Sequence, residues 1–345
     1  MKQYNLLLFS IILFALLIAC QPEQVATQLV TDPQVIFFTS DRNGDPASYS
    51  MSLDGKDVTA INLGEMPAGA SVDRPIYSPT AGKYFFSAVF NNQGDVFSVN
   101  ADGTGLVNLT DTPEYFDGSP FLSPDEKHIA FVSSQYGTDI MIMDTDGKNL
   151  LNLTNHNGQN DVIQWAPDSS RLFFSSNRAT PNIYSINLDG TGLMNISKGI
   201  GLDGAYSVSP DGEKIAFDSD REGAMDIFVI DSNGGDATNL TQNPAIDVEP
   251  LWSPDGTKIA FRSDRDGNWN LFVMNADGSN PIDLTKQFNL NPTTISWLPD
   301  SQHLLFTSQV DNQSDIFILA IDGSPPINLT NDPSNDYGAI VINME

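Results

Sequence analysis

Cysteine and histidine are scarce in this sequence: 345 residues contain one cysteine and three histidines. A single cysteine cannot form an internal disulfide bond, so Cys20 requires another explanation. His128, His156 and His303 are not spaced as metal ligands, and two of them, His128 and His303, begin equivalent predicted strands. The sequence therefore predicts neither a disulfide framework nor a histidine-based metal site, and no cofactor.

Basic residues are also few, with 16 Lys and Arg against 44 Asp and Glu and a formal net charge of −28. So acidic a chain disfavours binding to nucleic acid and to anionic lipid headgroups, because both carry negative charge. It favours cations or basic partners.

Signatures of helical and hydrolytic proteins are missing as well. No long segment has the i, i+3, i+4 apolar spacing of an amphipathic helix. There is no Gly-x-Ser-x-Gly elbow, and no α/β region that would hold a nucleophile, acid and base. An all-β, non-catalytic chain is therefore expected.

The amino terminus is typical of an export signal. Lys2 precedes an apolar run over 6–19, which is too short to span a bilayer. The run ends in Leu17-Ile18-Ala19-Cys20, which resembles the lipobox of bacterial lipoproteins. The resemblance implies a signal peptide over 1–19, lipidation of Cys20, a polar tether over 20–33 and sorting to the outer membrane or the periplasmic face of the envelope. Multiple acyl chains would anchor the protein stably.

A repeated unit accounts for nearly all of the remaining chain. The stretch Trp252–Thr285 contains four short apolar or β-branched runs separated by Asp-Gly turns, which predicts a meander of antiparallel strands. Its proline turn recurs with steps of 45, 43, 43, 44 and 45 residues, at Pro79, Pro124, Pro167, Pro210, Pro254 and Pro299. Four strands in about 44 residues are the signature of a β-propeller blade.

The termini supply a seventh blade. Residues 34–63 contain three strands but lack a first one, and residues 336–343 form a strand that nothing follows. The last strand is predicted to complete the first blade and close the ring. The predicted propeller covers 34–345, with blades at 34–63 plus 336–343, 73–110, 117–154, 161–197, 203–241, 247–285 and 291–330.

The units resemble the TolB-like, WD-type propeller repeats of bacterial envelope proteins. The resemblance rests on Trp252-Ser-Pro-Asp-Gly, Ile259-Ala-Phe, Ser263-Asp-Arg and Met274-Asn-Ala-Asp-Gly. In that family a partner protein engages the propeller at one end of its channel. TolB itself carries an α/β domain ahead of its propeller, whereas here a lipid site and a short tether stand in that place.

Acidic residues recur at the start of the predicted first strands, at Asp73, Asp117, Asp161, Asp203, Asp247 and Asp336, with Asn291 close to the seventh position. If first strands line the channel, these side chains ring one mouth of it. Each aspartate would accept backbone N–H bonds in the turn entering its blade, or the ring would bind a cation or a basic peptide.

A second set of acidic turns partly resembles calcium-binding loops. Asp264, Asp266, Asn268 and Asn270 alternate like the start of an EF-hand, but glycine is fourth rather than sixth and Asn275 is twelfth. Related turns begin at Asp41 and Asp220. Recurrence at one place in each blade favours turn formation and Asp–Arg pairing over calcium binding.

These patterns lead to a lipid-anchored envelope protein whose propeller binds a protein or an extracellular ligand with a basic segment. Two alternatives stay open: a carbohydrate-directed lyase or hydrolase that uses the channel-mouth carboxylates, and a structural role in an envelope assembly.

Overall fold

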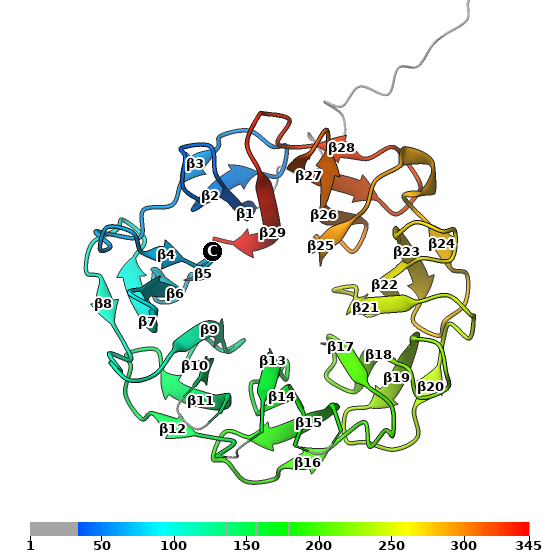
Figure 1. Cartoon of the computed structure of the whole chain (residues 1–345), viewed down its shortest axis with the longest axis horizontal. Helices are drawn as coiled ribbons and strands as arrows, with labels where there is room; N and C mark the ends of the chain where they lie inside the picture. Colours follow the sequence, from blue (N-terminus) through cyan, green and yellow to red (C-terminus); the bar gives the residue numbers. More distant parts are fainter. Residues whose placement is uncertain (1–33, 135–136, 156–157, 179, 345) are drawn as a thin grey trace, which may run out of the picture.

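The computed structural model describes residues 34–134, 137–155, 158–178 and 180–344. They form seven antiparallel sheets around a central opening (Figure 1). The predicted all-β, seven-bladed propeller is therefore confirmed. The predicted signal peptide, Cys20 and the tether lie outside the described residues. No helix in the described part of the chain is long and apolar enough to cross a bilayer.

Four blades, numbered in chain order, have four regular strands each. Blade 3 comprises β9 (Asp117–Leu122), β10 (His128–Ser133), β11 (Asp139–Asp144) and β12 (Leu151–Asn152). Blade 4 comprises β13 (Asn160–Trp165), β14 (Arg171–Ser176), β15 (Asn182–Asn187) and β16 (Met194–Asn195). Blade 5 comprises β17 (Asp203–Val208), β18 (Lys214–Ser219), β19 (Asp226–Asp231) and β20 (Thr238–Asn239). Blade 6 comprises β21 (Asp247–Trp252), β22 (Lys258–Ser263), β23 (Asn270–Asn275) and β24 (Ile282–Asp283).

Three blades depart from this pattern. Blade 1 comprises β29 (Asp336–Asn343), β1 (Gln34–Ser40), β2 (Ala47–Ser52) and β3 (Thr59–Ala60). Blade 2 has a first strand in two pieces and comprises β4 (Ser71–Val72), β5 (Ile76–Ser78), β6 (Lys83–Phe90), β7 (Gln93–Asn100) and β8 (Val107–Asn108). Blade 7 comprises β25 (Thr293–Trp297), β26 (His303–Val310), β27 (Gln313–Ala320) and β28 (Ile327–Asn328), preceded by the 3₁₀ helix η1 (Lys286–Phe288).

Strand β29 closes the ring by pairing with β1. The antiparallel register places Gln34 opposite Asn343 and Ser40 opposite Asp336. The predicted completion of the first blade by the last strand is thus confirmed. Ala339 of β29 packs with Leu305 and Ile316 of blade 7, so closure also joins the core between neighbouring blades.

The core lies between blades rather than at one centre. Phe173 and Ile183 of blade 4 pack in one cluster with Phe217 and Phe228 of blade 5, and these side chains are fully buried. Burial of a side chain of this size contributes about 1.5–3 kcal/mol. Both faces of a blade are therefore covered by its neighbours, as consecutive apolar residues in the third strands require.

In blades 2, 3, 5 and 7 the Asn-Leu-Thr motif fastens the fourth strand to an aspartate near the start of the third. In blade 3, Asn152 Nδ2 donates to Asp139 Oδ2 at 2.8 Å, and Thr154 Oγ1 donates to Asp139 Oδ1 at 2.8 Å. The Thr154 hydroxyl also accepts a bond from Ile140 N at 3.0 Å. The same bonds recur with Asp226, Asn239 and Thr241 in blade 5.

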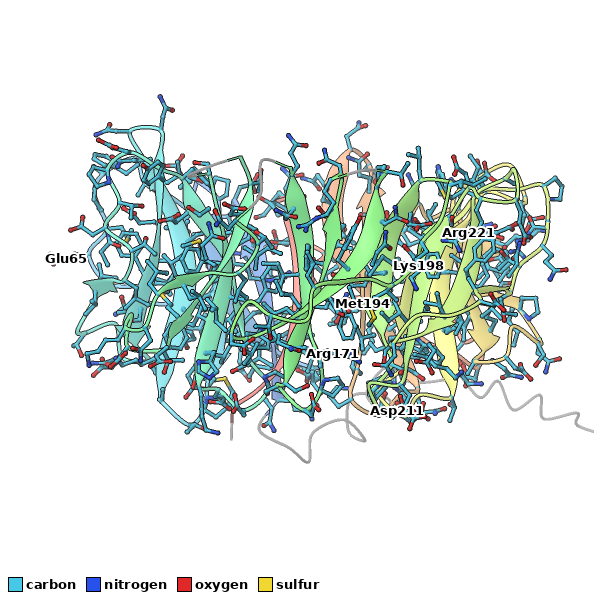
Figure 2. The ribbon with its side chains drawn as sticks, turned by 90° about the horizontal axis from the view of Figure 1, so that it is seen from below. Glu65, Arg171, Met194, Lys198, Asp211 and Arg221 are labelled. Carbon is cyan, nitrogen blue, oxygen red and sulfur yellow. The ribbon has the colours of Figure 1, made fainter. Side chains whose placement is uncertain are left out.

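The ring has two different faces. First strands begin, and second strands end, on one face, which we name the mouth face. The Ser-Pro-Asp-Gly turns and the turns between third and fourth strands lie on the opposite face, which we name the turn face. Figure 2 shows Arg221 and Lys198 toward the mouth face and Arg171 and Asp211 toward the turn face.

Candidate functional site at the channel mouth

Four of the six predicted aspartates begin a first strand and are buried. Asp117, Asp203, Asp247 and Asp336 are at most 3% exposed. Each lies opposite the serine that ends the second strand of its own blade, as Asp247 does with Ser263. These four residues therefore do not form a ring of exposed negative charges.

The donors to these carboxylates are side chains, which corrects the expectation that backbone N–H groups would satisfy them. Arg265 Nη2 donates to both Asp247 oxygens at 2.9 and 3.0 Å, and Asn243 Nδ2 donates to Oδ2 at 2.6 Å. Arg221 Nη2 and Arg42 Nη2 each donate to one oxygen only, Oδ1 of Asp203 at 2.8 Å and Oδ1 of Asp336 at 3.0 Å. In blade 3, Asp117 accepts a bond from Thr112.

Each of these arginines also lies over two aromatic rings of its blade. The Arg265 guanidinium is 4.4 Å from the Phe272 ring centre and 5.4 Å from that of Phe261. Its Nε donates to Ser263 Oγ at 2.9 Å. Because a guanidinium is planar and weakly hydrated, it suits such a half-buried stack. We name this arrangement of aspartate, serine, arginine and two rings the Asp–Arg clasp.

The aspartate preceding each arginine completes the turn. Asp264 Oδ1 accepts the N–H of Ile246 at 2.8 Å, and Asp220 Oδ1 accepts the N–H of Leu202 at 2.7 Å. Asp41 accepts the N–H of Asn335 at 2.7 Å. The aspartate of each turn therefore stabilises the backbone of the turn. The arginine that follows it pairs with the aspartate at the start of the first strand and not with its neighbour in the turn.

Two carboxyl groups of the clasps, those of Asp203 and Asp336, each have a buried oxygen atom. Burial raises the pKa of Asp336 above its usual range, although bonds from Ser40 and Arg42 act in the opposite direction. Oδ2 of Asp336 and Oδ2 of Asp203 are buried and have no hydrogen-bond partner within the described residues.

Asp161 does not occupy the position predicted for it. In blade 4, Asn160 pairs with Ser176 and accepts a bond from Arg178 Nη2 at 3.1 Å, so Asn160 holds the clasp position. Asp161 is the next residue, exposed, at the edge of a bulge. The buried residue that begins the first strand lies seven positions before the proline in blades 3 to 6, whereas Asp161 lies six before Pro167. Counting back from the proline would have identified Asn160.

Blade 3 has no arginine in the corresponding turn, and blades 2 and 7 lack the Asp–Arg clasp altogether. Their second and third strands are longer and meet in two-residue turns, Asn91-Asn92 and Asp311-Asn312, whose residues all have positive φ. Such turns suit the twist of a tight hairpin. Asn291 lies just before β25, where its N–H donates to Ser308 Oγ at 3.1 Å.

Asp73 lies at the mouth and is exposed. Its carboxylate accepts the N–H of Arg74 at 3.0 Å and a long bond from Ser87 Oγ at 3.4 Å. It borders a cavity of about 560 Å³, which we name the mouth cavity. Residues of blades 1, 2 and 3 line it, among them Asp45, Asp73, Arg74, Phe116 and Tyr337. Figure 1 shows β29, β4, β5 and β9 around this part of the opening.

The first strands carry bulges that turn the backbone at the channel. Glu249, in β21, has φ of 57°, and its N–H donates to Asp218 Oδ2 of blade 5 at 2.9 Å. The equivalent N–H of Gly338 donates to Thr307 Oγ1 of blade 7 at 3.3 Å. Burial raises the pKa of Asp218 to about 6, with the Glu249 carboxylate adding to the effect.

Apolar side chains are exposed where the chain enters the first strands. We name this set the apolar rim, and it consists of Phe116, Ile200, Leu202, Ile246 and Tyr337. Ile200 is 93% exposed. Because these connections lie on the mouth face, the side chains are exposed on that face at blades 1, 3, 5 and 6, and Phe116 and Tyr337 both line the mouth cavity. Exposed apolar side chains can contribute to an interaction surface. Sequence reasoning missed the apolar rim, although Phe116, Leu202 and Ile246 each directly precede a buried first-strand aspartate.

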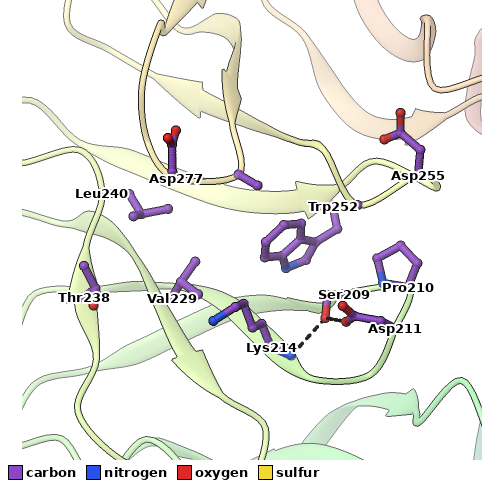
Figure 3. A pocket seen from close by; sticks show the side chains of 12 residues that line it. Ser209, Pro210, Asp211, Lys214, Val229, Thr238, Leu240, Trp252, Asp255 and Asp277 are labelled. Carbon is purple, nitrogen blue, oxygen red and sulfur yellow. Dashed lines mark hydrogen bonds between the residues drawn. The ribbon is translucent and has the colours of Figure 1, made fainter.

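A second cavity, of about 770 Å³, opens on the turn face between blades 5 and 6. Figure 3 shows the Trp252 indole between the two blades, with Lys214 and the bonded pair Ser209 and Asp211 beside it. Trp165 and Trp297 donate their indole N–H groups to carbonyls of the preceding blade, whereas that of Trp252 has no partner within the described residues. The bond from Ser209 to Asp211 shapes the proline turn and helps lower the Asp211 pKa.

Two of the histidines are on the turn face, away from the mouth. His128 Nδ1 lies 3.1 Å from Asp144, and His303 Nδ1 lies 2.6 Å from Asp300. Among the residues that the structure describes, no group of three or more His, Cys, Asp or Glu is placed to hold a metal ion.

Comparison with known proteins agrees with this architecture. The TolB beta propeller domain family matches residues 194–296. An uncharacterised protein of Agrobacterium fabrum (strain C58) is 30% identical over 113 residues, which are 30% of this chain and 36% of that protein. The chain thus matches about a third of the length of this curated relative.

Solved structures show the same fold at low sequence identity. TolB from Acinetobacter baumannii is 19% identical, with a TM-score of 0.55 over 93% of this chain and 85% of that one. An oligogalacturonate lyase in complex with manganese is 15% identical, with a TM-score of 0.67 over 84% and 86%. A puromycin hydrolase is 14% identical, with a TM-score of 0.69 over 87% and 53%. At such identities these similarities show the fold alone. Residues 194–296 therefore carry repeats of the TolB propeller type, within the seven-bladed ring that such repeats build.

Proposed function

We propose that the protein is a non-catalytic, lipid-anchored component of the bacterial envelope that docks a protein partner on its mouth face. The apolar rim supports this most directly, because it exposes apolar side chains on the face where the clasps hold the first strands of blades 1, 5 and 6. The net charge of −28 favours a partner with a basic segment. The resemblance of Leu17 to Cys20 to a lipobox supports the anchor at Cys20 and an outer-membrane or periplasmic location.

Crosslinking followed by capture from native membranes tests the docking surface. We expect Leu202→Ser combined with Ile246→Ser to abolish partner capture, because both side chains belong to the apolar rim. The matched control is Ile282→Ser on β24, at the outer edge of blade 6 in Figure 1, since Ile282 is 52% exposed and Leu202 53%. Equal capture by the rim and control variants would refute the proposal.

A glycan-directed lyase or hydrolase is the second candidate, and the lyase fold similarity is the observation that favours it. Such an enzyme would need reactive carboxylates at the mouth. Of the six predicted aspartates, Asp73 and Asp161 are exposed. Turnover of cell-wall or plant glycans by purified protein, lost in Asp73→Asn, would replace the docking proposal with this one.

A further inference from the structure

The mouth cavity lies where the regular pattern of blades is broken. Blade 2 lacks the Asp–Arg clasp, and its divided first strand leaves Asp73 exposed between blades 1 and 3. A cavity of about 560 Å³ is within the usual range for binding sites. It is more than sufficient for one long side chain.

Two aromatic rings border the mouth cavity and remain accessible. Phe116 is 44% exposed and Tyr337 is 40% exposed. The Phe116 ring nevertheless has a fixed position, because it packs directly on two glycines. A Cβ atom on Gly94 would lie 2.6 Å from the ring, and one on Gly118 would lie 2.8 Å from it. An exposed ring that is held in this way offers a rigid face to a ligand.

The charges of the mouth cavity favour a cation. Asp45 and Asp73 are both exposed, and Asp45 makes no ion pair with the other residues described. Arg74 is the one basic residue among those that line the cavity. Its guanidinium donates to the Gly338 carbonyl of β29, and with two carboxylates against one guanidinium the lining keeps a net negative charge. Burial lowers the Arg74 pKa.

The remaining walls suit an aliphatic chain. Val72, Val89, Ala70 and Pro46 line the cavity together with the charged groups. Lysine and arginine bury their methylene groups on apolar surface while the charged head stays at a polar site. A cation near an aromatic face gains about 0.5–2 kcal/mol, depending on how far it is desolvated.

We propose that the mouth cavity receives one lysine or arginine side chain of the docking partner, with its charge beside Asp45 and Asp73 and its stem against Val72 and Val89. This rests on the proposed function, because it names the residue by which the partner is anchored. Phe116 and Tyr337 then determine specificity for a cationic side chain over a neutral one of the same length.

Doubly blocked tripeptides test this site without the partner. Acetyl-Gly-Lys-Gly-amide is titrated against the full chain by NMR, beside the same peptide with norleucine in place of lysine. We expect the lysine peptide to bind at least about tenfold more tightly, and Phe116→Ala or Tyr337→Ala to weaken it about fivefold. Tyr337→Phe keeps the ring and should bind as the parent does.

Gly118→Ala separates the position of the ring from its presence. The substitution keeps Phe116 but displaces its ring, so we expect a loss similar to that of Phe116→Ala, with an unchanged chemical denaturation midpoint as the check on folding. Equal binding of the norleucine peptide, or displacement of the lysine peptide by the neutral disaccharide cellobiose, would overturn the proposal.

The two proposals fail in different ways. If Leu202→Ser and Ile246→Ser abolish partner capture while the tripeptides do not bind, the docking function stands and the mouth cavity is not its anchor. If the rim variants capture the partner normally, the docking surface is wrong, whatever the tripeptide titration gives.

Discussion

Blade 6 and blade 2 have the same repeat unit in sequence, but the aspartate of the first strand is buried in blade 6 and exposed in blade 2. In blade 6, Asp247 is buried under Arg265, and the residue before it is held by Asp264. In blade 2, the first strand is divided, a tight Asn91-Asn92 turn replaces the arginine turn, and Asp73 is exposed. The comparison teaches that Asp203, Asp247 and Asp336, which belong to complete clasps, are buried as structural residues. Asp73, in a blade that has no clasp, is exposed to ligands.

The largest loss of stability is expected from removing β29, the C-terminal strand that completes blade 1. A chain that ends at residue 335 loses β29, which pairs with β1 and packs on blade 7. We expect it to show no cooperative thermal transition by circular dichroism. A chain that ends at residue 343 keeps β29 and should melt like the parent. A cooperative transition at the parental temperature in the shorter chain would contradict closure by β29.

Opening one clasp tests the structural half of the comparison. Asp247→Ala leaves the Arg265 guanidinium half-buried without its carboxylate, and we expect a loss of about 3–5 kcal/mol in the free energy of unfolding. Urea denaturation followed by tryptophan fluorescence measures it. The double variant Asp247→Leu, Arg265→Met should recover most of the loss, because it removes both charges together. No recovery would show that the ion pair itself stabilises the blade.

Asp218 of blade 5, which accepts a bond from Glu249 of blade 6, makes the stability of the propeller depend on pH. Its folded pKa of about 6 exceeds the ordinary value of 3.8, so its contribution to stability is complete below pH 3.8 and is lost as pH rises through 6. A difference of this size corresponds to about 2 kcal/mol of lost stability between pH 4 and pH 7. Urea denaturation at both pH values measures it, and Asp218→Asn should remove that part of the pH dependence. A parent and variant with parallel pH profiles would contradict the raised pKa. Asp218→Thr, which imitates Thr307 of blade 7, is the control that keeps an acceptor for Glu249.

The smallest effect is expected in blade 2. Asp73→Ala removes an exposed carboxylate with one short backbone bond, so we expect the free energy of unfolding to change by less than about 0.5 kcal/mol. The same urea experiment measures it beside Asp247→Ala. Comparable losses in the two variants would erase the distinction between the blades.

The fold followed from the sequence because turn chemistry and spacing carry it. The proline turns fixed the period, and the unpaired strand at each terminus fixed the closure, which the pairing of Gln34 with Asn343 confirms. Neither inference required side-chain geometry.

The site followed only in part, because blade 4 has an asparagine at the buried position with an exposed aspartate directly after it, and the first strand of blade 2 is divided. Asp161 and Asp73 each lie six positions before a proline, one fewer than the buried aspartates of blades 3, 5 and 6. The arginine partners were visible as a repeated aromatic-x-Ser-Asp-Arg pattern at Phe38, Phe217 and Phe261, but the pattern does not show that the arginine reaches back to the first strand. The mouth cavity depends on the divided first strand of blade 2, and no local sequence motif predicts that division.

The direction of β1 has a consequence for orientation at a membrane. Gln34 lies opposite Asn343 and Ser40 opposite Asp336, so the chain enters the propeller on the turn face and runs toward the mouth face. On the proposed anchor at Cys20, the 14 residues of 20–33 would span at most about 50 Å when fully extended. Because the attachment point is on the turn face, a tether of this length allows the mouth face to point away from the bilayer, open to a partner approaching from the aqueous side.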